Sequence, residues 1–107
     1  MIVRIWHGYT TLENAPKYEH ILKNEVIEGI KDMKVKGFRK IEVLTRELED
    51  QTQFTTIMWF DDIESVKQFA GEDYEKCYVP DVARSVLSDF DRISVHHELI
   101  YETGPDN

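Results

Sequence analysis

The chain has 107 residues, of which 41% are hydrophobic, so a single folded domain is expected. Its net charge of −8 opposes binding to nucleic acid, and its only cysteine, Cys77, excludes an intramolecular disulfide and a cysteine-rich zinc site. No apolar run reaches the roughly 20 residues of a membrane span and the N-terminus does not resemble a signal peptide, so we expect a soluble cytoplasmic protein without a membrane partner.

The first predicted strand covers residues 1–9, and apolar side chains lie on both of its sides. We therefore expect helices to cover one side and another structure to cover the other. A long amphipathic helix is predicted next, from Ala15 to Lys34, because apolar residues recur there at helical spacing. Asn14 precedes this helix as a candidate N-cap, and Gly37 marks the turn that follows it.

Two runs rich in strand-forming residues follow, 38–48 and 53–60, and the short polar turn between them predicts a hairpin. A second helix is predicted after them, because Asp61 and Glu64 form a capping-box pattern. Gly71 is expected to end this helix.

The remainder of the chain is predicted to hold an irregular, partly helical insert over 72–88 and a last strand over 92–101. The single domain is expected to cover residues 1–102, with a flexible tail over 103–107. The resulting order is β-α-β-β-α-β. It is typical of a ferredoxin-like α+β sandwich, in which two helices cover one face of a four-stranded antiparallel sheet.

Such a fold leaves the other face of the sheet open to solvent. We expect Ile2, Trp6 and either Met58 or Trp59 to lie on that open face. An apolar patch of this kind favours self-association, and a homodimer through the open sheet face is the simplest way to cover it.

The sequence contains none of the common nucleophile, phosphate-binding or dinucleotide-binding motifs, so no cofactor is expected. Three histidines, His7, His96 and His97, lie on the first and last strands, which are neighbours in this fold. Because His96 and His97 point to opposite faces, at most one of them joins His7, and no metal site is expected.

Two polar residues interrupt these apolar strands. We expect Arg4 and Glu98 to form an ion pair across the sheet; the alternative is that Arg4 binds a carboxylate of a substrate. Aromatic residues are dense around the second helix and the insert, which favours a pocket for a flat, apolar ligand with the insert as its lid.

Four segments together resemble the antibiotic biosynthesis monooxygenase (ABM) family of the dimeric α/β-barrel superfamily. They are RIWHG at 4–8, MWFDDIESVKQFAGED at 58–73, YVPD at 78–81 and VHHEL at 95–99. The resemblance implies a ferredoxin-like protomer with a pocket between helices and sheet, and a dimer whose two sheets close into a dimeric α/β barrel. The family includes cofactor-free oxygenases of aromatic polyketides and haem-degrading oxygenases.

The resemblance to the haem-degrading branch is incomplete. Its asparagine on the first strand falls at His7, its tryptophan on the second helix falls near Phe69, and its haem-binding histidine falls near Tyr78. All three identities differ, so haem degradation is not expected.

The resemblance instead implies a cofactor-independent monooxygenase acting on a small aromatic compound, phenolic or quinone-like. His7 is the expected catalytic base, because its side of the first strand is expected to face the helices. Tyr78 and His96 are expected to donate hydrogen bonds to an oxyanion. The expected aromatic wall consists of Trp59, Phe60 and Phe69. Two alternatives remain open: a non-catalytic dimer that binds or senses a small molecule, and a purely structural dimer with a filled core.

Overall fold

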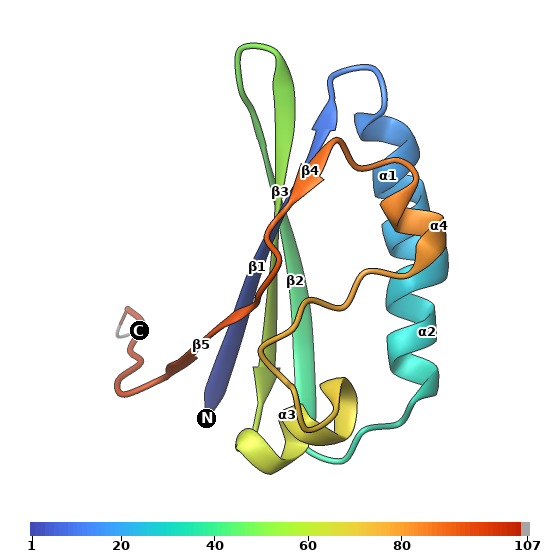
Figure 1. The fold of residues 1–107 in the computed structure, drawn as a ribbon. Helices are drawn as coiled ribbons and strands as arrows, with labels where there is room; N and C mark the ends of the chain where they lie inside the picture. Colours follow the sequence, from blue (N-terminus) through green and yellow to red (C-terminus); the bar gives the residue numbers. More distant parts are fainter. Residues whose placement is uncertain (106–107) are drawn as a thin grey trace.

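The computed structural model describes residues 1–105. It has the predicted ferredoxin-like α+β fold, with helices on one face of an antiparallel sheet and the other face bare (Figure 1). The strands are β1 (Ile2–Thr11), β2 (Phe38–Glu47), β3 (Gln51–Phe60), β4 (Asp89–Phe90) and β5 (Val95–Glu98). Their order is β2-β3-β1-β4, and β5 also pairs with β1, so the expected proximity of the first and last strands is confirmed.

The first predicted helix is confirmed as three consecutive helical segments: α1 (Ala15–Ile21), a π-helical turn η1 (Leu22–Val26) and α2 (Ile27–Asp32). Asn14 occupies the N-cap position, but its side chain makes no capping hydrogen bond. The buried side chains of this helix are Tyr18, Ile21, Leu22, Val26 and Ile30. They recur at helical spacing and face the sheet, which fixes the helix over β1, β2 and β3.

The second predicted helix is α3 (Ile63–Ala70), and its cap differs from the prediction. Asp62, and not Asp61, accepts the capping hydrogen bond from the backbone N–H of Ser65, at 2.9 Å. Asp61 instead forms an exposed ion pair with Arg39. The helix ends at Gly71 as predicted, because that residue has a φ of 92° that glycine adopts without strain.

The predicted last strand, 92–101, is wrong in extent, since β4 and β5 are separate short strands. Asp91 explains the interruption. Its carboxylate accepts from the backbone N–H of His7 at 3.2 Å, and its carbonyl accepts from Trp6 Nε1 at 2.8 Å, so the chain bends there. The insert before β4 contains α4 (Asp81–Arg84). Of the predicted tail, 103–105 has no secondary structure, and 106–107 lies outside the described residues.

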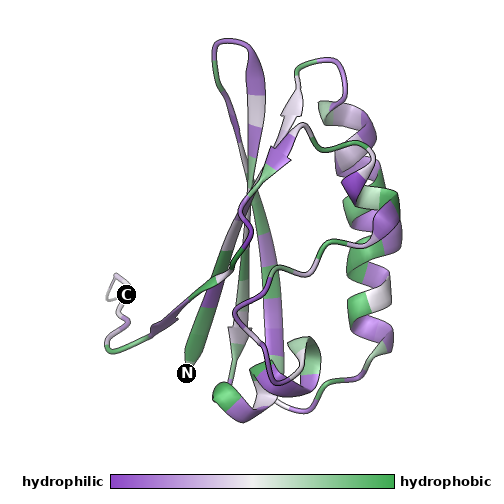
Figure 2. Cartoon of the chain, viewed as in Figure 1, coloured by the Kyte–Doolittle hydropathy of each residue, from purple (hydrophilic) through white to green (hydrophobic). Residues whose placement is uncertain are grey.

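The two faces of the sheet differ in what covers them. Even-numbered residues of β1 face the helices: Arg4 is opposite Met58, and Trp6 is opposite Thr56. The prediction that Ile2 and Trp6 lie on the open face is therefore wrong, whereas the prediction that one of Met58 and Trp59 lies there is confirmed for Trp59. Figure 2 shows apolar segments on both the helices and the strands, alternating with polar ones. Within residues 1–105, no helix is both long and apolar enough to cross a membrane.

Candidate functional site

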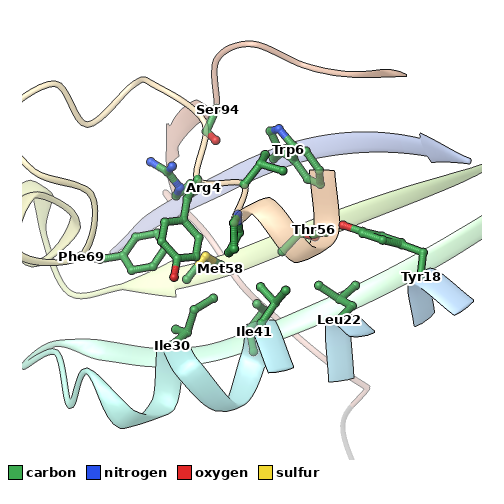
Figure 3. Close-up of a pocket in the computed structure, with 15 residues that line it drawn as sticks. Arg4, Trp6, Tyr18, Leu22, Ile30, Ile41, Thr56, Met58, Phe69 and Ser94 are labelled. Carbon is green, nitrogen blue, oxygen red and sulfur yellow. The ribbon is translucent and has the colours of Figure 1, made fainter. Parts of the chain in front are cut away.

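A cavity of about 40 Å³ lies between the helices and the covered face of the sheet (Figure 3). Its polar lining residues are Arg4, Tyr18, Thr56, Tyr78 and Ser94. Its apolar lining consists of Trp6, Leu22, Val26, Ile30, Ile41, Met58, Phe69, Val79, Pro80 and Ala83. The insert supplies several of these residues and forms one wall of the cavity, in agreement with the prediction that the insert is the lid of the pocket.

The volume limits what this cavity can hold without movement. A buried water needs roughly 10–15 Å³, so about 40 Å³ accommodates only a few water molecules. Cavities that hold drug-sized ligands measure roughly 300–1,000 Å³. Any ligand with an aromatic ring therefore requires one wall to move outward.

Arg4 is the charged group of the cavity, and it is only 3% exposed. Its Nη1 donates to the Tyr74 carbonyl at 2.5 Å and to His96 Nε2 at 3.1 Å, and its Nη2 donates to the Lys76 carbonyl at 3.1 Å. The predicted ion pair with Glu98 is wrong, because Glu98 is exposed and lies opposite Ile2. Burial lowers the pKa of Arg4 to about 10, an effect that the nearby Cys77 thiol opposes.

His96 lies directly opposite Arg4 on β5 and is half-buried. Because a guanidinium only donates, the Nε2 atom of His96 must accept, and the ring proton sits on Nδ1. Burial, with further contributions from the charges of Arg4 and His97, lowers the pKa of His96 to about 4. The ring is therefore neutral at pH 7, and it packs edge-on against Tyr74 with the ring centroids 5.2 Å apart.

His7 lies on the face opposite to the cavity, so the prediction that it faces the helices is wrong. Side chains alternate along β1, and Trp6 and Arg4 occupy the covered side. His7 Nδ1 instead contacts Asp91 Oδ2 at 2.9 Å, and the two side chains are 36% and 39% exposed. The structure does not bring His7 together with Tyr78 and His96.

The predicted aromatic wall is divided between three places. Phe69 and Tyr78 line the cavity, with their ring centroids 5.0 Å apart. Phe60 is fully buried behind Phe69, in the core beside the cavity. Trp59 lies on the open face, where its Nε1 donates to Glu42 at 2.9 Å, so its assignment to the pocket is wrong.

Sequence reasoning missed Trp6, Tyr18 and Ser94 as lining residues. Tyr18 is 2% exposed, and burial raises its pKa to about 12, so its hydroxyl remains a neutral donor. One signal for the site was available in the sequence: Arg4 is the only Lys, Arg, Asp or Glu residue of β1. Within residues 1–105, no group of three His, Cys, Asp or Glu side chains is arranged to hold a metal ion.

A second hollow, of about 300 Å³, lies between the start of α1 and the β2–β3 hairpin. It is larger but shallow, and its charged lining residues, Glu19 and Glu47, are exposed to solvent. No buried charge or aromatic cluster converges there, so the cavity around Arg4 is the better candidate site.

Comparisons with known proteins give similarity in structure without close similarity in sequence. No protein-family model matches the chain, and no curated protein matches it in sequence. A protein from Bacillus cereus assigned to the antibiotic biosynthesis monooxygenases superposes with a TM-score of 0.67 at 10% identity, over 97% of both chains. A variant of MhuD with two manganese protoporphyrin IX molecules bound per active site superposes with a TM-score of 0.68 at 13% identity, over 98% of this chain and 100% of that one. The resemblance to the ABM family is thus confirmed at the level of the fold, which this chain shares with both proteins over almost its full length.

Proposed function

We propose that the protein is a cofactor-independent monooxygenase of a small aromatic compound, phenolic or quinone-like. The observation that carries the proposal is the buried guanidinium of Arg4 at the polar end of an aromatic and aliphatic cavity. A fold shared with a protein assigned to the antibiotic biosynthesis monooxygenases supports the same reaction class.

The proposed reaction oxidises an activated methylene group with dioxygen. The substrate loses a proton from that carbon, and the resulting anion transfers electrons to dioxygen. One oxygen atom forms the new carbonyl group, and the other leaves as water together with the two hydrogens of the methylene. The protein must therefore stabilise the substrate anion and exclude bulk water.

The residues of the cavity fit the stabilising role better than the role of a base. Arg4 supplies a buried cation for the anion, and Tyr78 places a phenol in the same lining. His96 is a weak base, since its pKa is about 4 and its Nε2 lone pair already accepts from Arg4. His7 lies on the other face. Proton loss would then depend on the acidity of the substrate itself, which a nearby guanidinium increases.

The working unit is proposed to be a homodimer that covers the open face. Val95, Ile5 and Ile57 form an apolar row across β5, β1 and β3 on that face. Val95 is 48% exposed, and Leu44 on β2 is 50% exposed. Because the row is apolar and partly exposed, the same face of a second copy would bury it through a self-complementary contact.

Oxygen uptake tests the proposed reaction. An oxygen electrode should record uptake above the buffer rate when purified protein is mixed with anthrone or dithranol, which carry an activated methylene group. We expect Arg4→Gln to lower this rate at least tenfold, since it removes the charge that stabilises the anion. His7→Ala, on the opposite face, should retain the wild-type rate.

Two outcomes would contradict the proposal. Uptake at the buffer rate with every such compound would exclude the reaction. If the same compounds nevertheless bind, the protein is the non-catalytic binding or sensing dimer. A rate that depends on His7 and not on Arg4 would place the chemistry on the other face of the sheet.

A further inference from the structure

The charge of Arg4 is not balanced by an acidic side chain. Among residues 1–105, none of the ion pairs includes Arg4, and its three hydrogen-bond acceptors are two carbonyls and a neutral imidazole. Removing an ion from water costs several kcal/mol, so buried charges are normally paired with a counterion. A guanidinium that is 3% exposed and has only neutral partners is therefore poised to accept an anion.

The guanidinium also has hydrogen-bonding capacity to spare. It carries five N–H donors, and the bonds to Tyr74, His96 and Lys76 use three of them. Two donors remain without a partner among the described residues, enough for one carboxylate or enolate oxygen group. Ser94 is 1% exposed and lines the cavity beside Arg4, so its hydroxyl is a further donor for the same group (Figure 3).

The surroundings of Arg4 restrict the rest of the ligand. The guanidinium carbon lies 5.3 Å from the centroid of the Phe69 ring, and the remaining wall is mostly apolar. A ligand with several charges would leave some of them unpaired in this wall, which is unfavourable. We propose that the cavity selects an aromatic or aliphatic compound that carries a single anionic oxygen group, and that Arg4 binds this group. This inference rests on the proposed function.

The contacts of Arg4 also suggest how such a ligand enters. Tyr74 and Lys76, whose carbonyls accept from Arg4, both belong to the segment that closes the cavity. The two spare donors of Arg4 can bind the anion while these carbonyls stay bonded. An aromatic ring still requires an outward shift of this segment, since it needs more volume than about 40 Å³.

Binding of benzoate and of benzamide tests the inference, because the two have nearly the same shape and differ in charge. Isothermal titration at pH 7 should give at least a tenfold lower Kd for benzoate with the wild-type protein. Arg4→Gln should remove this difference, and Arg4→Lys should retain part of it because the cation remains. Arg84→Gln, which removes an exposed cation of α4, is the matched control and should bind as the wild type does.

Equal affinity for the two probes, no binding of benzoate, or a preference that persists in folded Arg4→Gln would overturn the inference. The comparison of the two probes with wild-type protein is decisive even if Arg4→Gln fails to fold. Binding preference and oxygen uptake are separate readouts. A preference for benzoate without any oxygen uptake would reject the proposed reaction alone, whereas uptake without a preference for anions would reject this inference alone.

Discussion

The two faces of the sheet are built from the same strands, yet they offer different chemistry. On the covered face, Arg4 is buried among apolar side chains and has only neutral partners. On the open face, His7 and Asp91 form a contact that solvent reaches. A charge in a water-poor cavity interacts far more strongly with a ligand than one at the surface does. The position of a residue relative to the helices therefore decides its functional value more than its residue type does.

The largest expected effect comes from two adjacent residues on opposite faces. Phe60 is fully buried, whereas Trp59 lies on the open face. Phe60→Ala should lower the free energy of unfolding by about 3–5 kcal/mol, whatever the protein concentration. Trp59→Ala should lower the free energy of unfolding much less in dilute solution. If the open face is a dimer contact, the loss caused by Trp59→Ala should grow as the protein concentration rises.

Urea unfolding followed by far-UV circular dichroism at two protein concentrations measures both effects. Equal, concentration-independent losses for the two variants would mean that the two faces are buried alike. The distinction between a covered and an open face would then fail.

The second effect concerns the assembly. Ile57 lies at one end of the apolar row, beside Ile5 of β1 and opposite Glu42 of β2. Ile57→Lys places a charge there, so we expect the mass measured by light scattering to fall from that of a dimer to that of a monomer. Gln68→Lys, on the exposed surface of α3, is the control and should remain dimeric. A monomeric wild-type protein, or a dimeric Ile57→Lys, would contradict the proposed interface.

The smallest effect is a pH dependence that arises from the covered face. The folded-state pKa of His96 is about 4, below the ordinary value of 6.5, because of burial and the charges of Arg4 and His97. Between these values the unfolded chain takes up a proton that the folded protein does not, so stability falls as pH decreases from about 6.5 to 4. Since His96 is partly exposed and solvent screens it, we expect a contribution on the order of 1 kcal/mol.

Thermal unfolding between pH 4 and pH 7 checks this contribution. His96→Gln keeps an acceptor near Arg4 but does not titrate, so its Tm should change less with pH than that of the wild type. His20→Gln, on the exposed surface of the first helix, should retain the wild-type profile. An unchanged profile in His96→Gln would show that His96 is not held neutral by its surroundings.

Much of the fold follows from the sequence, because its signals are local. The spacing of Tyr18, Leu22 and Ile30 predicts the first helix, and Gly71 predicts the end of α3. The interruption of the last strand could not be predicted, since it depends on contacts of Asp91 with His7 and Trp6 from a strand more than eighty residues away.

The candidate site was only partly predictable, for a different reason. Alternation along β1 separates Arg4 and Trp6 from Ile5 and His7, but both sets include apolar residues. The alternation therefore does not indicate which set faces the helices, and the prediction that the set with His7 does so is wrong. Only the pairing of the strands and the packing of the first helix determine that Arg4 is buried and His7 is not.

The central claim is that ligands bind on the covered face, and the two tryptophans report on the two faces. Trp6 lines the cavity and donates to the Asp91 carbonyl, whereas Trp59 donates to Glu42 on the open face. A single ¹⁵N–¹H correlation spectrum of the wild-type protein resolves both indole N–H signals, and Trp59→Phe assigns them. Titration with benzoate should shift the Trp6 signal and leave the Trp59 signal in place. A shift of the Trp59 signal with the Trp6 signal unmoved would contradict the account.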